Sequence, residues 1–210
     1  MKELENKVVI ITGASSGIGI STAFCFAKLG AKLVLHDSTK ELVDEAFNVS
    51  ARYLSKSSVL KVIGDITNDA VRDKIVNDCL KKYNKIDILV NNAGISKPCT
   101  LISDFDLNDF DLVMNVNTRS VVALTQKCLP SLIQNKGSII NVSSVLSTIG
   151  VHGSLYYCMS KGALDQFTRC LALDLASKQV RVNSVNPAVL RQPIFQEIGL
   201  PEEKVIFLYT

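Results

Sequence analysis

A tyrosine and a lysine stand at an i, i+4 spacing, as Tyr157 and Lys161. In a helix this spacing places both side chains on one face. A phenol titrates near pH 10, so a base that works near neutrality needs a pKa lowered by about 3 pH units, and a neighbouring ammonium favours the phenolate. The pair could therefore move a proton on an alcohol or carbonyl oxygen. The plainer alternative is an amphipathic tyrosine beside a solvated lysine.

Two polar residues earlier in the chain could complete such a site. Ser144 comes two residues after the predicted strand at 138–142, and Asn117 lies within a predicted helix. A serine hydroxyl both donates and accepts hydrogen bonds, so it can hold a substrate oxygen in either redox direction. The alternatives are a strand-end cap for Ser144 and a helix hydrogen bond for Asn117. Ser143 and Asn115 are their nearest rivals.

A glycine-rich turn follows the first predicted strand and opens a helix. Glycines permit a tight turn and close approach of a pyrophosphate, whose charge is favoured by free N–H groups at a helix N-terminus. The alternative is a turn that serves packing alone. The candidate cofactor contacts are Gly13, Ser15, Ser16, Gly17, Ile18 and Gly19.

The second predicted strand is followed at once by His36 and Asp37. An acidic residue at about this distance from the glycine turn can accept both hydroxyls of an adenosine ribose, and it would repel a 2′-phosphate. NAD is therefore favoured over NADP, although nearby Lys40 leaves NADP as an alternative. Asp37 could instead cap the helix that follows.

Apolar runs alternate with amphipathic stretches throughout the chain. Near-continuous apolar runs indicate strands buried on both faces, and the alternation predicts an α/β fold with a doubly wound, Rossmann-like parallel sheet of about six strands in the order 3-2-1-4-5-6 and helices on both faces. Strands are predicted at 8–11, 33–35, 59–63, 86–90, 138–142 and 180–185, and helices near 17–29, 39–55, 68–83, 108–134 and 157–177.

Further motifs follow the third and fourth predicted strands: Asp65-Ile66 and Asn91-Asn92-Ala93-Gly94. Taken in order with the glycine turn, Asn117, Ser144 and the Tyr157 to Lys161 segment, they resemble the short-chain dehydrogenase/reductase family over nearly the whole chain.

This resemblance implies specific roles for four residues. Tyr157 would be the acid/base, Lys161 would hold the nicotinamide ribose and lower the pKa of the tyrosine, Ser144 would orient the substrate oxygen, and Asn117 would support a proton relay. Asp65 would contact adenine, although it could instead only shape the turn into the next helix. Tyr157 and Lys161 would also contact the cofactor, and the other contacts implied are Ile66, Asn91, Ala93, Gly94, Pro187 and Val189.

The chain departs from the family pattern after the sixth strand. Ala188 replaces a glycine and Gln192 replaces a threonine that contacts the nicotinamide amide. We expect residues 187–210 to be irregular, and the chain ends at Thr210 within what would be the substrate-covering segment. The resemblance implies a homo-oligomer for the full-length form.

Composition excludes several other classes. With 210 residues we expect a single domain over residues 1–210, and a net charge of +3 without clustered lysines argues against a nucleic-acid partner. The N-terminus has no apolar run before a cleavage site, and no stretch is long enough to span a membrane, so we expect a cytoplasmic protein. The six cysteines match no zinc motif, and we expect no metal.

The sequence therefore predicts an oxidoreductase that transfers a hydride between NAD(H) and a small-molecule secondary alcohol or ketone. One alternative is an NADP-dependent ketone reductase. The other is an NAD-binding protein without turnover, because the C-terminal lid is curtailed.

Overall fold

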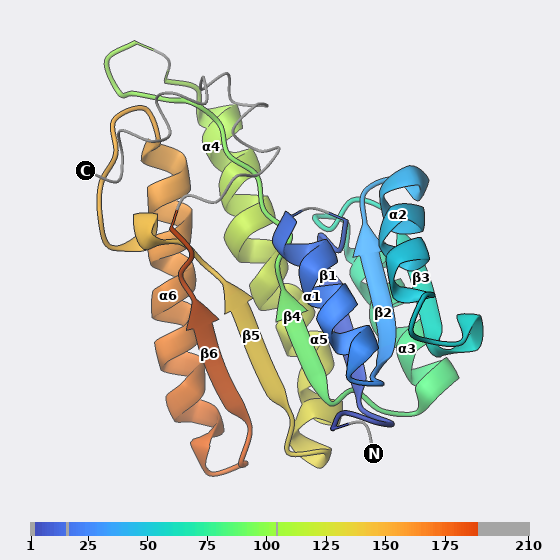
Figure 1. Ribbon diagram of the computed structural model, residues 1–210. Helices are drawn as coiled ribbons and strands as arrows, with labels where there is room; N and C mark the ends of the chain where they lie inside the picture. Colours follow the sequence, from blue (N-terminus) through green and yellow to red (C-terminus); the bar gives the residue numbers. More distant parts are fainter. Residues whose placement is uncertain (1–2, 16, 104, 189–210) are drawn as a thin grey trace.

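The computed structural model of the chain describes residues 3–15, 17–103 and 105–188. Its strands form one six-stranded sheet in the order β3-β2-β1-β4-β5-β6 (Figure 1), and every neighbouring pair is parallel. The predicted strand order is confirmed. The strands are β1 (Val8–Thr12), β2 (Lys32–Asp37), β3 (Val59–Ile63), β4 (Ile88–Asn91), β5 (Ser138–Val142) and β6 (Arg181–Val185).

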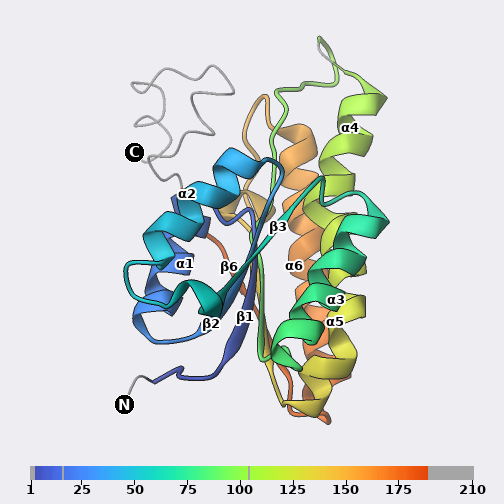
Figure 2. The same ribbon diagram turned by 90° about the vertical axis from the view of Figure 1, so that its right-hand side faces the viewer.

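Helices cover both faces of the sheet, as Figure 2 shows edge-on. Each face buries its own apolar cluster, which explains why the central strands read as continuous apolar runs. The doubly wound, Rossmann-like architecture is confirmed. One face carries α1 (Gly17–Lys28) and α2 (Lys40–Ser50), and the other carries α3 (Asp69–Tyr83), α4 (Leu107–Met114), α5 (Ser120–Gln134) and α6 (Leu155–Ala176).

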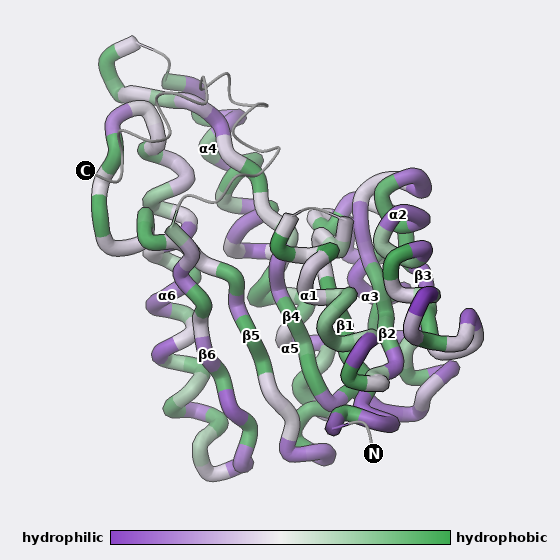
Figure 3. The backbone as a smooth tube through the Cα atoms, in the orientation of Figure 1, coloured by the Kyte–Doolittle hydropathy of each residue, from purple (hydrophilic) through white to green (hydrophobic). Residues whose placement is uncertain are grey.

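Burial on both faces holds for the centre of the sheet and not for its edges. All five residues of β1 are buried, whereas exposed and less exposed residues alternate along β6. Figure 3 shows the same contrast, with the central β4 hydrophobic and β6 mixed. The expectation that every strand is buried on both faces is therefore wrong for the two strands at the edges of the described sheet, β3 and β6, which lack a second neighbour.

The long helix predicted over residues 108–134 is interrupted. It consists of α4, one π-helical turn (η2, Asn115–Arg119) and α5. A π-turn inserts one extra residue per turn and re-aims the side chains that it carries. The interruption falls on Asn117, one of the predicted site residues.

One other difference concerns the end of a helix. α2 ends at Ser50, before the predicted 55, and its last turn is followed by turns that bring Leu54 against the core beneath α1 and α2. Thr39 caps α2 by accepting a hydrogen bond from the Leu42 N–H, and Asn68 caps α3 in the same way. Two short 3₁₀ turns complete the fold: η1 (Lys56–Ser58) and η3 (Val145–Ser147).

In the described part of the chain, no helix combines the length and apolar character that crossing a bilayer requires. All six cysteines are free thiols.

A buried carboxylate holds together the amino-terminal ends of β1 and β4. Asp87 accepts a hydrogen bond of 2.8 Å from the Val8 N–H and lies 3.2 Å from the Lys7 ammonium and 2.9 Å from the Lys85 ammonium. Burial raises the pKa of Asp87, but these three donors outweigh burial and the pKa is lowered overall. The charged carboxylate therefore stabilises the fold.

We expect Asp87→Asn to lower the free energy of unfolding by about 1–3 kcal/mol, because it removes a charged, buried acceptor. The pKa of Asp87 is lower in the folded chain than in the unfolded one. Its contribution is therefore present above the unfolded pKa of about 4 and is lost as the pH falls through the folded value. Urea unfolding at pH 7 and pH 3 measures both effects.

The control is Asp78→Asn, which breaks a half-exposed i, i+4 pair with Lys74. We expect a loss below about 0.5 kcal/mol for it. Equal losses in the two variants would contradict the role given to Asp87.

Candidate active site

The side chains of Tyr157 and Lys161 lie on one face of α6, as their spacing predicts. The Lys161 Nζ lies 5.5 Å from the centre of the Tyr157 ring. Tyr157 is the third residue of α6 and lies in its first turn. The start of α6 lies at the end of the sheet where the parallel strands finish (Figure 1). The alternative of a solvated lysine is wrong, because Lys161 is only 3% exposed.

The Lys161 ammonium is held by the carboxyl end of β5. Its Nζ donates a hydrogen bond of 2.8 Å to the carbonyl oxygen of Val142. Burial lowers the pKa of Lys161 to about 8, and the negative charge of Asp165 acts in the opposite direction. Lys161 therefore changes between its ammonium and neutral amine forms within one or two pH units of neutrality.

The pKa of Tyr157 is raised, which is the opposite of what the sequence predicted. Burial raises the pKa of its phenol, and a side-chain hydrogen bond with Ser144 lowers it by a smaller amount. The prediction was a pKa lowered by Lys161. Desolvation of the phenolate is the larger effect among the protein groups that surround Tyr157.

Ser144, and not Ser143, faces the tyrosine. The Ser144 hydroxyl interacts with Tyr157 and also accepts a hydrogen bond of 3.1 Å from the Leu146 N–H, so the residue caps η3 as well. The Ser143 hydroxyl points to the other side and donates to the carbonyl oxygen of Lys161 at 3.3 Å. Ser144 can therefore both cap η3 and serve as a residue of the candidate site.

The side chain of Asn117 is fully buried at the π-turn. Its Oδ1 accepts from the Ile95 N–H at 2.8 Å, and its Nδ2 donates to the Ile95 carbonyl at 2.9 Å and to the Ser160 hydroxyl at 2.9 Å. A methyl group placed on Gly94 would lie 3.4 Å from Asn117 Oδ1 and 3.5 Å from Lys161 Nζ. Asn117 therefore borders the same space as the lysine.

The glycine turn packs so closely that side chains are excluded from it. Gly13 has a positive φ of 60°, and a Cβ on Gly19 would lie 1.9 Å from the carbonyl oxygen of Gly13. Among the described residues of the first turn of α1, 17–20, none is acidic, so the positive end of the helix dipole is not neutralised there.

Asn92 clamps this turn, a role that sequence reasoning missed. Its Nδ2 donates to the carbonyl oxygens of Thr12 at 3.1 Å and Gly13 at 2.6 Å. The Thr12 hydroxyl in return accepts from the backbone N–H groups of Asn92 and Ala93. The available signal was the alternation of side chains along a strand, which turns successive asparagines to opposite sides.

Asp37 lies beside the glycine turn at the end of β2. Its Oδ2 accepts from the backbone N–H of Ser15 at 3.1 Å and from the Ser15 hydroxyl at 2.6 Å, and its Oδ1 accepts from the Ser38 N–H at 2.8 Å. The alternative of Asp37 as a helix cap is wrong, because Thr39 caps α2.

Other predicted cofactor contacts make hydrogen bonds within the protein or are buried. The exposed Asp65 accepts from the Thr67 N–H at 2.8 Å and so shapes the turn toward α3, while Ile66 beside it is buried. The Asn91 side chain turns away from the glycine turn and donates to Asn141 at 2.9 Å.

Pro187 accepts a hydrogen bond of 3.0 Å from the Val145 N–H and so joins the end of β6 to the Ser144 turn. Ser16, Val189 and Gln192, with the rest of 189–210, lie outside the described residues.

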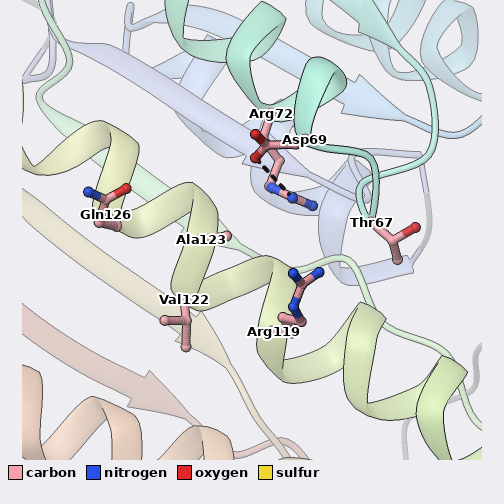
Figure 4. A pocket seen from close by; sticks show the side chains of 7 residues that line it. All are labelled: Thr67, Asp69, Arg72, Arg119, Val122, Ala123 and Gln126. Atoms are coloured by element: carbon pink, nitrogen blue, oxygen red, sulfur yellow. Dashed lines mark hydrogen bonds and ion pairs between the residues drawn. The ribbon is translucent and has the colours of Figure 1, made fainter.

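An open groove of about 740 Å³ lies elsewhere, between α3 and α5 (Figure 4). Arg72 pairs with Asp69 at 3.1 Å within it. The described residues that line the groove include none of those predicted for catalysis or cofactor binding. They are Thr67, Asp69, Arg72, Arg119, Val122, Ala123 and Gln126.

The residues at the ends of the strands fit a nicotinamide dinucleotide. The glycine turn leaves backbone and an unneutralised helix N-terminus facing the place of a pyrophosphate, and a carboxylate stands at the end of β2. Gly94 leaves open the space beside Lys161 and Asn117, which a larger side chain would fill.

Comparisons with known proteins agree with this arrangement. The short chain dehydrogenase family model matches residues 7–203. The chain is 37% identical to a 3-oxoacyl-(acyl-carrier-protein) reductase of Thermotoga maritima, over 95% of this chain and 80% of that protein, and 36% identical to a meso-2,3-butanediol dehydrogenase of Serratia marcescens, over 95% and 76%.

Solved structures give the same result. A short-chain dehydrogenase/reductase of Caenorhabditis elegans with cofactor, of unknown function, has a TM-score of 0.89 and 36% identity, covering 98% of this chain and 78% of that one. A 3-ketoacyl-(acyl-carrier-protein) reductase of Brucella melitensis complexed with NADH has a TM-score of 0.85 and 35% identity, covering 92% and 80%. The chain belongs to the short-chain dehydrogenase/reductase family and is an oxidoreductase of that family.

Proposed function

We propose that the chain transfers a hydride between NAD(H) and a secondary alcohol or ketone of small to medium size, with Tyr157 as the acid/base. The observation that carries this proposal is the convergence of three groups at one strand end. The Tyr157 phenol interacts with the Ser144 hydroxyl, and its ring lies 5.5 Å from the Lys161 ammonium.

The bound nicotinamide supplies the hydride acceptor or donor. Ser144 orients the substrate oxygen by hydrogen bonding, and Tyr157 removes the hydroxyl proton during alcohol oxidation or donates it during ketone reduction. The Lys161 ammonium offers N–H donors to the nicotinamide ribose, and its positive charge beside the Tyr157 ring acts against the burial that raises the pKa of the phenol. Asn117 positions the backbone of Ile95 at the edge of the same space.

Support for NAD over NADP comes from Asp37, whose carboxylate lies within hydrogen-bonding distance of the glycine turn. The C. elegans and B. melitensis relatives were solved with a cofactor and with NADH, respectively. The cytoplasmic location and the assembly of several copies of the chain remain predictions.

Tyr157→Phe should lower kcat by a factor of about 100 or more, because general acid–base catalysis contributes about 100- to 10,000-fold. NADH binding should change by less than about three-fold, since the hydroxyl is only one of many groups that contact the cofactor. Steady-state oxidation of a panel of secondary alcohols and NADH fluorescence titration measure these two quantities.

The matched control is Tyr53→Phe, at a residue that is 42% exposed and lies after α2. It should retain wild-type turnover. Turnover at the wild-type rate in Tyr157→Phe would show that the acid/base assignment is wrong.

Wild-type protein should bind NADH at least about ten-fold more tightly than NADPH, a difference of about 1.4 kcal/mol. Asp37→Ser should bring the two affinities to within about three-fold, because it removes the charge that repels a 2′-phosphate. Glu45→Gln, the same charge change at an exposed residue of α2, should leave the ratio unchanged. Separate fluorescence titrations with the two cofactors decide this, and equal wild-type affinities would overturn the Asp37 argument.

Gly19→Ala should weaken NADH binding by at least about ten-fold, because its Cβ would overlap the Gly13 carbonyl and distort the turn. Gly150→Ala is the control, since a Cβ there meets nothing within 4 Å. Circular dichroism checks that both variants fold. Unchanged NADH affinity in folded Gly19→Ala would remove the glycine turn from the cofactor site.

A further inference from the structure

A buried carboxylate on α6 contacts both loops that flank the candidate site. Asp165 lies one helical turn beyond Lys161 on the same face and is 5% exposed. Its Oδ2 accepts hydrogen bonds from the Ser147 hydroxyl at 2.5 Å and from the Asn186 Nδ2 at 2.8 Å. One oxygen atom thus joins α6 to the turn after β5 and to the segment after β6.

The same cluster reaches the backbone of Ser144. The Asn186 Nδ2 lies 3.1 Å from the Ser144 carbonyl oxygen and 3.0 Å from the Ser147 hydroxyl. Asn186 therefore sits between Asp165 and the residue whose hydroxyl faces Tyr157. Loss of the carboxylate would leave the Asn186 amide and the Ser147 hydroxyl without a charged acceptor.

The charge of Asp165 also acts on Lys161. Burial raises the pKa of Asp165, but hydrogen bonds from Ser147, Ser143 and Asn186 and the charge of Arg169 lower it overall, so the carboxylate is ionised at neutral pH. That negative charge raises the pKa of Lys161, which burial otherwise lowers. Asp165 therefore favours the ammonium.

Few charged groups share this region within the described residues. Tyr157 and Asp165 face Lys161 from its own helix, and exposed Arg169 acts on Asp165. The elements packed against them present uncharged polar groups: the Val142 carbonyl from β5, Asn117 from η2, Ser143 and Ser147 around η3, and Asn186 after β6.

We propose that Asp165 is a positioning residue of the active site, which holds the Ser144 turn against α6 through Ser147 and Asn186 and supplies the counter-charge to the buried Lys161. This inference rests on the proposed roles of Tyr157, Lys161 and Ser144. It assigns two separable effects to one carboxylate: one geometric, on Ser144, and one electrostatic, on Lys161.

Two variants separate the effects. Asp165→Asn keeps the shape of the side chain and removes its charge, whereas Ser147→Ala removes one hydrogen bond and keeps the charge. Asp174→Asn, at an exposed residue on the same helix, is the matched control for the loss of one negative charge. Ketone reduction is measured from pH 6 to 10 for each variant.

We expect Asp165→Asn to lower kcat at neutral pH by about ten-fold, with KM for NADH within about two-fold. Reduction needs a protonated Tyr157 and a charged Lys161, so activity falls as the pH rises. Removal of the Asp165 charge should move this alkaline limb to lower pH by about half a pH unit or more. Ser147→Ala should lower kcat by about three-fold without moving the limb, and Asp174→Asn should match wild type.

NMR of protein with ¹³Cε-labelled lysine gives a readout independent of turnover. The Lys161 signal, assigned by its loss in Lys161→Met, should titrate at lower pH in Asp165→Asn than in wild type and at the wild-type pH in Ser147→Ala. An unchanged limb and an unchanged Lys161 titration in folded Asp165→Asn would overturn the electrostatic effect. Wild-type kcat in Ser147→Ala would overturn the geometric one, and that test holds even if Asp165→Asn does not fold.

These outcomes are distinct from failure of the proposed function. Wild-type turnover in Tyr157→Phe would refute the acid/base role of Tyr157. The lysine titration would still decide whether Asp165 acts on Lys161.

Discussion

The hydrogen bond from the Lys161 ammonium to the Val142 carbonyl is the interaction on which the site depends. It places a cation that is 3% exposed at the carboxyl end of β5. Burial lowers the lysine pKa from 10.5 to about 8, and since one pKa unit corresponds to about 1.4 kcal/mol, the buried ammonium is destabilised by about 3 kcal/mol. Such a group persists because the carbonyl, the nearby tyrosine ring and the Asp165 carboxylate favour it together.

The parallel sheet explains why these partners are available. All strands finish at one edge, so the segments that follow β1, β2, β4, β5 and β6 converge there although they are far apart in sequence. Asn92 fixes the glycine turn from one side, and the Asp165 cluster fixes the Ser144 turn from the other. α6 carries Tyr157, Lys161 and Asp165 on consecutive turns, so one helix brings the proposed catalytic pair and the Asp165 cluster together. The proposed catalytic residues Tyr157 and Lys161 thus lie on a helix, and a short, hydrogen-bonded turn supplies Ser144.

Residue types and periodicity predicted the strands, the helical layers, the shared face of Tyr157 and Lys161 and the place of the glycine turn, and the strand order followed from the Rossmann-like pattern. They could not predict the π-turn at Asn117, because a continuous helical pattern runs through it. The opposite orientations of Asn91 and Asn92 depend on where β4 ends, and the residue pattern does not fix that point. Asp165 resembles any polar residue on an amphipathic helix, and only the return of β6 beside α6 shows that it is buried. The raised pKa of Tyr157 has the same origin, because burial depends on tertiary packing.

The most direct test of the central claim is a crystal structure of the chain with bound NADH. We expect the Lys161 Nζ to lie within hydrogen-bonding distance, about 2.7–3.2 Å, of a nicotinamide ribose hydroxyl while it keeps its bond to the Val142 carbonyl. We also expect the Tyr157 hydroxyl to face the nicotinamide ring. A nicotinamide ribose bound away from Lys161, with Tyr157 directed elsewhere, would contradict the proposed roles of both residues.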